Sequence, residues 1–314
     1  MPLRPTTREL AHDGSQRGAR SLSRALDGLI GVILLAGSVR PSQLQKAVGR
    51  FVPDLPVEAG RTVLDCWHQQ LADVASYFDI KPVSPRVIVD RSITREGFEQ
   101  DPFDYRGTGG LLRDLAPQDP IHDNEYLLVA NGAQILFEPL PVLIEDLAAT
   151  GGDISMACTD DGAPIGLMLV RCGCLKSIPR RGFIDLNEQA LPALAEKYDV
   201  MVVRFSPQVN APIRTFSGYL DVMRKYHRHL KQQVDANDPF AEDWHETFRL
   251  IEPGADVHDS AVVHDSVVLS GARVEADAVL VRTLVCPDAV VTRRRSAVDC
   301  LVSTTNSRMK DLDR

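Results

Sequence analysis

Short aliphatic runs alternate with longer amphipathic segments over the first three quarters of the chain. The runs at 29–35, 86–90 and 125–130 have the length and composition of strands that are buried on both faces. Within 62–78, apolar residues recur at spacings of three and four, which predicts a helix. The same criteria predict strands at 154–158, 165–170 and 200–205, and helices at 138–150, 187–198 and 217–234. Strands alternating with helices predict an α/β fold with a doubly wound, mostly parallel sheet.

The period of the apolar positions changes in the last quarter of the chain. From residue 251 an aliphatic side chain recurs every six residues, slipping to five, with small residues, Asp, Gly or Pro between. The set is Ile251, Val257, Val263, Val268, Val274, Val279 and Val285. This period is typical of a hexapeptide parallel β-helix, which we predict for 251–291. A short β-meander is the alternative interpretation.

Together the two patterns divide the chain into four predicted parts. These are a mobile N-terminal extension (1–27), an α/β domain (28–245), a β-helix (246–291) and a polar tail (292–314). The Arg-rich start followed by an apolar run superficially resembles a signal peptide, but Glu9 and Asp13 interrupt its charged part.

The acidic balance of the chain excludes several classes of protein. The 314 residues carry 43 Asp and Glu against 35 Lys and Arg, a net charge of -8, which argues against a general nucleic-acid binder. With 44% apolar and 25% charged residues the chain is neither disordered nor fibrous. Its 6 cysteines are scattered, which is typical of a reducing compartment, and no apolar run is long enough to span a bilayer. We therefore expect a cytoplasmic protein with neither nucleic-acid nor membrane partners.

Candidate ligand-binding residues lie at the end of three of the predicted strands or shortly after it. They are Gly37-Ser38, Asp90-Arg91 and Asn131-Gly132. Ligands of open α/β sheets bind at the carboxyl ends of the strands, so we expect these segments to converge there.

Several segments resemble motifs of one family. They include 32–37 (Val-Ile-Leu-Leu-Ala-Gly), 107–113 (Gly-Thr-Gly-Gly-Leu-Leu-Arg), 131–132 (Asn-Gly) and 185–192. With the order of elements, they make the chain similar to the sugar-1-phosphate nucleotidyltransferases (NDP-sugar pyrophosphorylases) that carry a C-terminal hexapeptide left-handed β-helix. The resemblance implies a nucleotidyltransferase-like domain over 28–245 and a catalytic role for Arg40 at the α-phosphate. The nucleotide-binding residues that it implies are Gly37, Ser38, Gly107, Thr108, Gly109, Gly110, Asn131 and Gly132.

The sequence departs from this family where the chemistry needs a metal. Ala133 and Pro212 stand at the positions of the two Asp residues that hold Mg²⁺ in the family, and no Glu-Lys-Pro motif occurs between Asp160 and Gly166. Magnesium requires oxygen ligands such as carboxylates, which Ala and Pro do not provide. We therefore predict no metal-binding residues. The cofactor is unknown, and Mg²⁺ is expected only if the protein is active.

These observations predict a nucleotidyltransferase-like protein of sugar-nucleotide or polysaccharide metabolism that binds a nucleotide or nucleotide sugar. One alternative is an active nucleotidyltransferase whose metal site has moved to Asp90 or Asp104, with Arg91 or Arg106 adding positive charge. Another is a structural or regulatory assembly subunit. A third is a hexapeptide acyltransferase that uses His258 or His264 as general base. We also expect a homo-oligomer, or a partner subunit bound through the β-helix.

Overall fold

A seven-stranded sheet forms the centre of the computed structural model, which describes residues 28–37, 42–91, 94–101, 106–235, 247–304 and 309–310. The extension 1–27, Ser38, Arg40 and Asp104 lie outside the described residues. In the order of the sheet, the strands are β10 (Val200–Phe205), β8 (Ile154–Thr159), β9 (Pro164–Arg171), β6 (Tyr126–Asn131), β1 (Leu29–Leu35), β4 (Pro85–Val89) and β5 (Glu99–Gln100). Only β9 is antiparallel to its neighbours. The prediction of an α/β fold with a mostly parallel sheet is confirmed.

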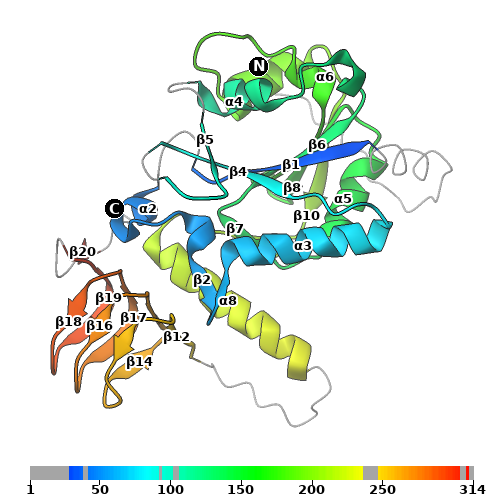
Figure 1. The fold of residues 1–314 in the computed structure, drawn as a ribbon. Helices are drawn as coiled ribbons and strands as arrows, with labels where there is room; N and C mark the ends of the chain where they lie inside the picture. Colours follow the sequence, from blue (N-terminus) through cyan, green and yellow to red (C-terminus); the bar gives the residue numbers. More distant parts are fainter. Residues whose placement is uncertain are drawn as a thin grey trace.

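Helices cover both faces of this sheet (Figure 1). One face packs against α3 (Val63–Phe78), α5 (Leu140–Ala149) and α8 (Phe216–Asp235). The other packs against α4 (Gly107–Leu115), α6 (Cys172–Leu175) and α7 (Leu191–Ala195). The short α2 (Gln43–Val48) follows β1. No helix within the described ranges is long and apolar enough to cross a membrane.

The predicted helix at 62–78 shows how sequence determines the local structure. Thr62 caps the helix by accepting from the Asp65 N–H, and the Asp65 carboxylate accepts from the Thr62 N–H in return. The apolar stripe faces the core, with Val63, Trp67 and Leu71 buried. The predicted helix at 187–198 is different. It begins as a π-helical turn, η3 (Leu186–Ala190), and continues as α7 only to Ala195.

Short elements complete the α/β part. Two small antiparallel pairs join β2 (Pro56–Glu58) to β3 (Arg61–Thr62) and β7 (Gln134–Leu136) to β11 (Asn210–Pro212). Two 3-10 turns are η1 (Val52–Asp54) and η2 (Pro120–His122).

The C-terminal strands form a stack in which each strand pairs in parallel with one 17 residues later. We call residues 249–302 the C-terminal stack. Its strands are β12 (Arg249–Ile251), β13 (Asp256–Val257), β14 (Val262–His264), β15 (Ser266–Val268), β16 (Arg273–Val274), β17 (Val279–Val285), β18 (Val290–Val291) and β19 (Ser296–Val302); β20 (Met309–Lys310) pairs antiparallel with β19. Parallel pairing contradicts the β-meander alternative, in which neighbouring strands are antiparallel.

The stack continues beyond the predicted boundary at residue 291. Residues 296–302, predicted as part of a polar tail, form β19, which pairs with β17 on both sides of its corner at Asp299. The sequence conceals this strand because three consecutive arginines at 293–295 form a turn, although the six-residue period continues from Val291 to Ala297. Ala297, Cys300 and Val302 then return to the interior of the stack.

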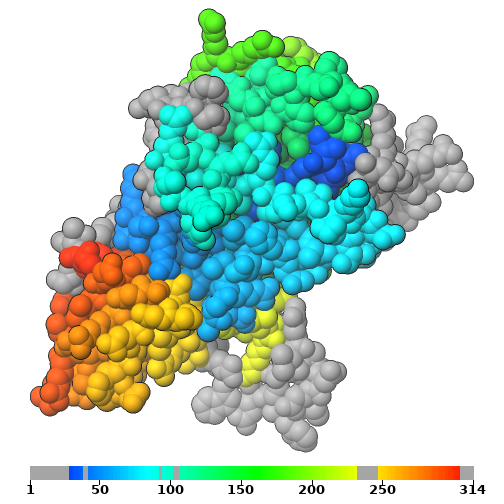
Figure 2. All heavy atoms as spheres, in the orientation of Figure 1, coloured from blue at the N-terminus to red at the C-terminus, as the bar shows by residue number. Residues whose placement is uncertain are grey.

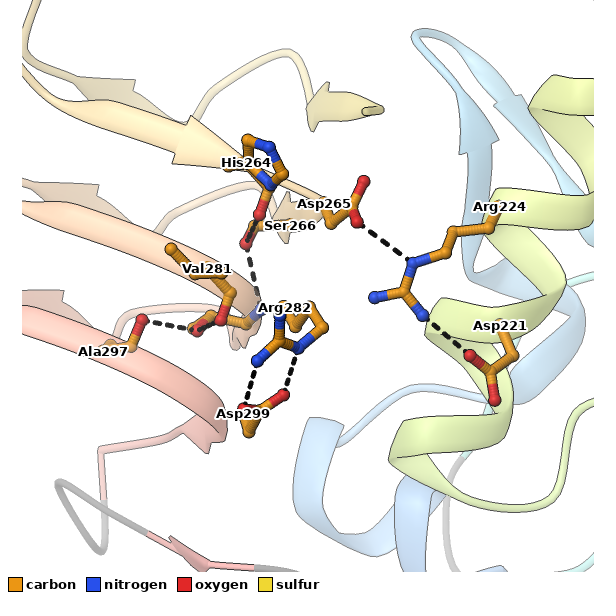
Figure 3. Close-up of polar contacts among 10 residues, drawn as sticks. Asp221, Arg224, His264, Asp265, Ser266, Val281, Arg282, Ala297 and Asp299 are labelled. Atoms are coloured by element: carbon orange, nitrogen blue, oxygen red, sulfur yellow. Dashed lines mark hydrogen bonds and ion pairs between the residues drawn. The ribbon is translucent and has the colours of Figure 1, made fainter. Parts of the chain in front are cut away.

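Left-handed backbone at one corner turns each coil of the stack. Asp265, Arg282 and Asp299, spaced by 17 residues, have φ of 47°, 47° and 49°. A left-handed non-glycine residue costs about 1–2 kcal/mol, which the surrounding ladders must offset. Arg282 forms an ion pair with Asp299 at this corner (Figure 3).

The same corner attaches the stack to α8. Figure 3 shows Arg224 on α8 between Asp221 of its own helix, at 2.7 Å, and Asp265 of the stack, at 3.1 Å. A second ion pair joins Arg50 to Glu252 at 2.8 Å. Apolar side chains of the stack, including Leu250 and Val267, belong to the same core as the α/β part. The stack therefore packs against the α/β part of its own chain. Figure 2 shows that the rest of the stack projects from the α/β part.

A half-buried histidine lies in this contact. His227 on α8 stacks on Phe248, with ring centroids 5.6 Å apart and planes at 1°. Its Nε2 is buried and has no hydrogen-bond partner among the residues that the structure describes. Burial lowers the pKa of His227 below 6.5, against the opposing effects of the Glu58 carboxylate and the Val57 backbone.

We expect His227 to make stability fall in mild acid. Its folded-state pKa lies below its unfolded value, so the unfolded state binds more protons once the pH drops below about 6.5. The contribution of neutral His227 to the free energy of unfolding is fully present above that pH and is lost as the pH falls towards the folded-state pKa. Urea unfolding at pH 7.5 and 5.5 should show a smaller pH effect in His227→Phe, which keeps an aromatic ring beside Phe248. Equal pH effects in the two proteins would contradict this assignment.

Candidate functional site

The candidate site lies where β1 and β6 end side by side at the carboxyl edge of the sheet. Leu35 is in register with Asn131, and the Gly132 N–H donates to the Leu35 carbonyl at 2.8 Å. After β1 the chain crosses to β4 on one side, whereas β6 lies on the other, which makes this the point where the winding direction changes. The predicted convergence of the segments at Gly37 and at Asn131-Gly132 therefore holds.

Close backbone packing defines the loop after β6. A Cβ added at Gly132 would lie 3.3 Å from Leu34 Cβ, and one at Gly166 would lie 3.0 Å from Asn131 Cβ. The Asn131 Oδ1 accepts from the Ala133 N–H at 3.0 Å, which closes a tight turn. The Trp67 indole N–H donates to the Gly132 carbonyl at 3.3 Å. Sequence reasoning identifies Trp67 only as a core position, since nothing in its spacing indicates this bond.

Ala133 and Pro212 also converge, although 79 positions separate them in the sequence. Strands β7 and β11 pair so that Gln134 lies opposite Pro212, and the Ile213 N–H donates to the Ala133 carbonyl at 2.8 Å. The two positions that the resemblance assigns to metal ligands thus lie side by side, and neither side chain has an oxygen. The nearby Gln134 and Asn210 form an amide pair, with Asn210 Nδ2 donating to Gln134 Oε1 at 2.7 Å.

These residues do not fit a magnesium ion. Within the described ranges no three His, Cys, Asp or Glu side chains come together to hold a metal. Asp90 at the end of β4 is buried, and its Oδ2 accepts from Gln45 Nε2 at 3.0 Å. One buried carboxylate that already accepts a hydrogen bond does not provide the oxygen set that Mg²⁺ requires.

The glycines at 107–110 pack against another segment of the same chain. Gly107 has φ 70°, and a Cβ there would lie 2.4 Å from the Ile184 carbonyl oxygen. That oxygen accepts from the N–H groups of Gly109 and Gly110 at 3.0 and 3.3 Å. Thr108 Oγ1 accepts from the Leu186 N–H at 3.1 Å. The contact with 184–186 therefore accounts for the small residues, and their role in nucleotide binding stays a prediction.

The two arginines proposed as substitutes for metal charge are both engaged. Arg106 forms a two-point ion pair with Asp114, at 2.8 and 3.1 Å, and donates to the carbonyls of Gly110 and Gly182. Arg91 Nε donates to the Asp101 carbonyl at 2.8 Å. Both guanidinium groups are thus held by the fold.

The histidines of the acyltransferase alternative do not form a common site. His258 follows β13, and its Nδ1 accepts from the Ser260 N–H at 3.1 Å in a turn. His264 ends β14, which belongs to a different sheet of the stack. Both side chains are exposed.

Comparison with known proteins assigns no family to the chain. No family model matches the sequence, and no curated protein matches it. Among solved structures, the chain is similar to the crystal structure of a Mycobacterium tuberculosis Rv0371c homolog from Mycobacterium sp. strain JC1. That similarity has 17% sequence identity and a TM-score of 0.42, and it covers 63% of this chain and 96% of the other.

Proposed function

We propose that this protein binds a nucleotide or nucleotide sugar at the carboxyl ends of β1 and β6, and that it lacks magnesium-dependent pyrophosphorylase activity. The convergence of Gly37 with Asn131-Gly132 supports a ligand at this edge. The observation that carries the second part is the contact between Ala133 and the Pro212–Ile213 segment. Phosphoryl transfer depends on cations that neutralise developing charge, and this pair provides no carboxylate to hold one.

The C-terminal stack supports the resemblance in a second way. Each coil of the stack is 17 residues long, which equals two repeats of six residues and one of five. The residues at one corner of each coil have left-handed backbone. We infer that the stack is the short left-handed parallel β-helix that the resemblance implies. A role in sugar-nucleotide or polysaccharide metabolism then follows from the resemblance as part of this proposal.

Ligand binding is tested by thermal unfolding with nucleoside triphosphates, nucleoside diphosphates and nucleotide sugars, each with and without Mg²⁺. A ligand at 100 times its Kd stabilises by about 2.7 kcal/mol, which shifts the Tm of a chain of this size by about 4 °C. Asn131→Ala should reduce the shift because it opens the turn at Ala133, whereas Asn187→Ala, at an exposed position on η3, should not. Absence of any shift with every compound would refute binding.

Catalysis is tested separately by pyrophosphate release from each nucleoside triphosphate with sugar 1-phosphates. We expect the rate with Mg²⁺ to equal the rate without protein, because the described part of the chain offers no ligand set for the ion. Mg²⁺-dependent release that EDTA abolishes would overturn this part and favour a relocated metal site.

A further inference from the structure

Within the described part of the chain, strand β10 leaves one long edge of the central sheet open. Among the described strands it pairs only with β8, whereas the opposite edge strand, β5, has two residues. Proteins commonly protect such edges with short strands, proline, lysine or covering segments. The six residues of β10 include neither proline nor lysine, and Val202 at its middle is 55% exposed.

The register of β10 shows which backbone groups lie on the open edge. Val200 is in register with Ile154, and the Ile154 N–H donates to the Asp199 carbonyl. In a parallel pair this means that alternate residues, from Asp199 through Met201 and Val203, bond inward to β8. The N–H and C=O groups of Val200, Val202 and Arg204 therefore point outward.

A strand that pairs with this edge must match three outward-facing residues. An antiparallel copy of β10 does so in one register, with Val202 opposite its symmetry mate and Val200 opposite the partner's Arg204. All six outward backbone groups of each strand then find partners, and the most exposed side chain lies on the two-fold axis. The open edge is thus complementary to itself.

Charge is compatible with this arrangement. Arg204 is the only charged residue of β10, and it faces Val200 rather than a second arginine. With a rise of about 3.3 Å per residue, the two Arg204 side chains lie about 13 Å apart along the strands, so their repulsion is weak. If the register of the two β10 strands shifted by two residues, some outward backbone groups would lose their partners and the distance between the two Arg204 side chains would change.

We propose that a second copy of this chain pairs with the β10 edge, so that one continuous sheet runs through a two-fold dimer. The inference goes beyond the proposed function and does not depend on ligand binding. Two six-residue strands bury less than a standard interface of about 1,600 Å², so we expect a dissociation constant in the range of about 1–100 µM.

The first test is sedimentation velocity of the full chain from about 1 to 500 µM, a range chosen to span the expected dissociation constant. We expect a concentration-dependent dimer, and Val202→Pro should weaken it at least tenfold. Proline removes the central outward N–H without removing a bond to β8, so the monomer should keep its fold and its thermal unfolding. Val262→Lys is the matched control, since Val262 is 54% exposed on the C-terminal stack.

A second measurement keeps the proposal testable if Val202→Pro fails to fold. Hydrogen exchange of the wild-type amides at Val200, Val202 and Arg204 should slow as the concentration rises, whereas Met201 and Val203 should be protected throughout. A chain that stays monomeric over the whole range would overturn the proposal. Dimerisation that Val262→Lys abolishes and Val202→Pro leaves intact would overturn it in favour of the stack.

Discussion

Replacing Trp67 by alanine is expected to lower the free energy of unfolding by about 3–5 kcal/mol, because it truncates the largest fully buried side chain among the described residues. The indole is 2% exposed in the main core, where α3 covers the sheet. Truncation leaves a large cavity and removes the donor to the Gly132 carbonyl, which lies in the loop of the candidate site. Urea unfolding monitored by far-UV circular dichroism measures the change.

Trp67→Phe separates the two contributions. It keeps most of the buried volume but removes the indole N–H, so we expect it to cost about 1–3 kcal/mol because the Gly132 carbonyl loses its donor in a buried place. Ligand-induced thermal shifts should weaken in Trp67→Phe if the bond positions the loop. A Trp67→Ala protein as stable as wild type would show that α3 does not pack as described.

Replacing Gly107 by alanine is expected to cost about 2–5 kcal/mol, the sum of left-handed backbone strain and overpacking. The added methyl would lie 2.4 Å from the Ile184 carbonyl oxygen, so α4 or the 184–186 segment must move. Such a movement would also stretch the bonds from Gly109 and Gly110 to that oxygen. Chemical unfolding of the purified variant gives the magnitude.

Gly49→Ala is the matched control for this substitution. Gly49 has φ 71°, against 70° for Gly107, but no atom lies within 4 Å of its added Cβ. It should therefore show only the backbone cost of about 1–2 kcal/mol. Equal losses of unfolding free energy in the two variants would mean that close packing of 184–186 against Gly107 adds nothing to the cost of the substitution.

Much of the secondary structure follows from local pattern. The stripe of Val63, Trp67 and Leu71 predicts α3 because a helical period of 3.6 places these side chains on one face. The run at 29–35 predicts β1 because a short aliphatic run that ends at Ala36-Gly37 is typical of a strand covered on both faces. The six-residue period predicts a repeating stack, although the arginine turn at 293–295 conceals its last strand.

The candidate site is predictable only in part. The rule for open sheets places Gly37 and Asn131-Gly132 at one edge, and the structure brings them there. The motif at 107–110 resembles a nucleotide contact, yet its partners within the chain are Ile184 and Leu186. A glycine in a sequence shows that something approaches closely, but not what approaches.

The amino-acid sequence by itself determined which residues are buried and the period at which they recur. This pattern is local, because each helix or strand has its own period of apolar residues. Tertiary structure alone decided which strands pair, that β9 runs against its neighbours, and that Ala133 meets the segment of Pro212. Those contacts join residues far apart in the chain, and their free energy depends on crossovers and close packing that no local period encodes.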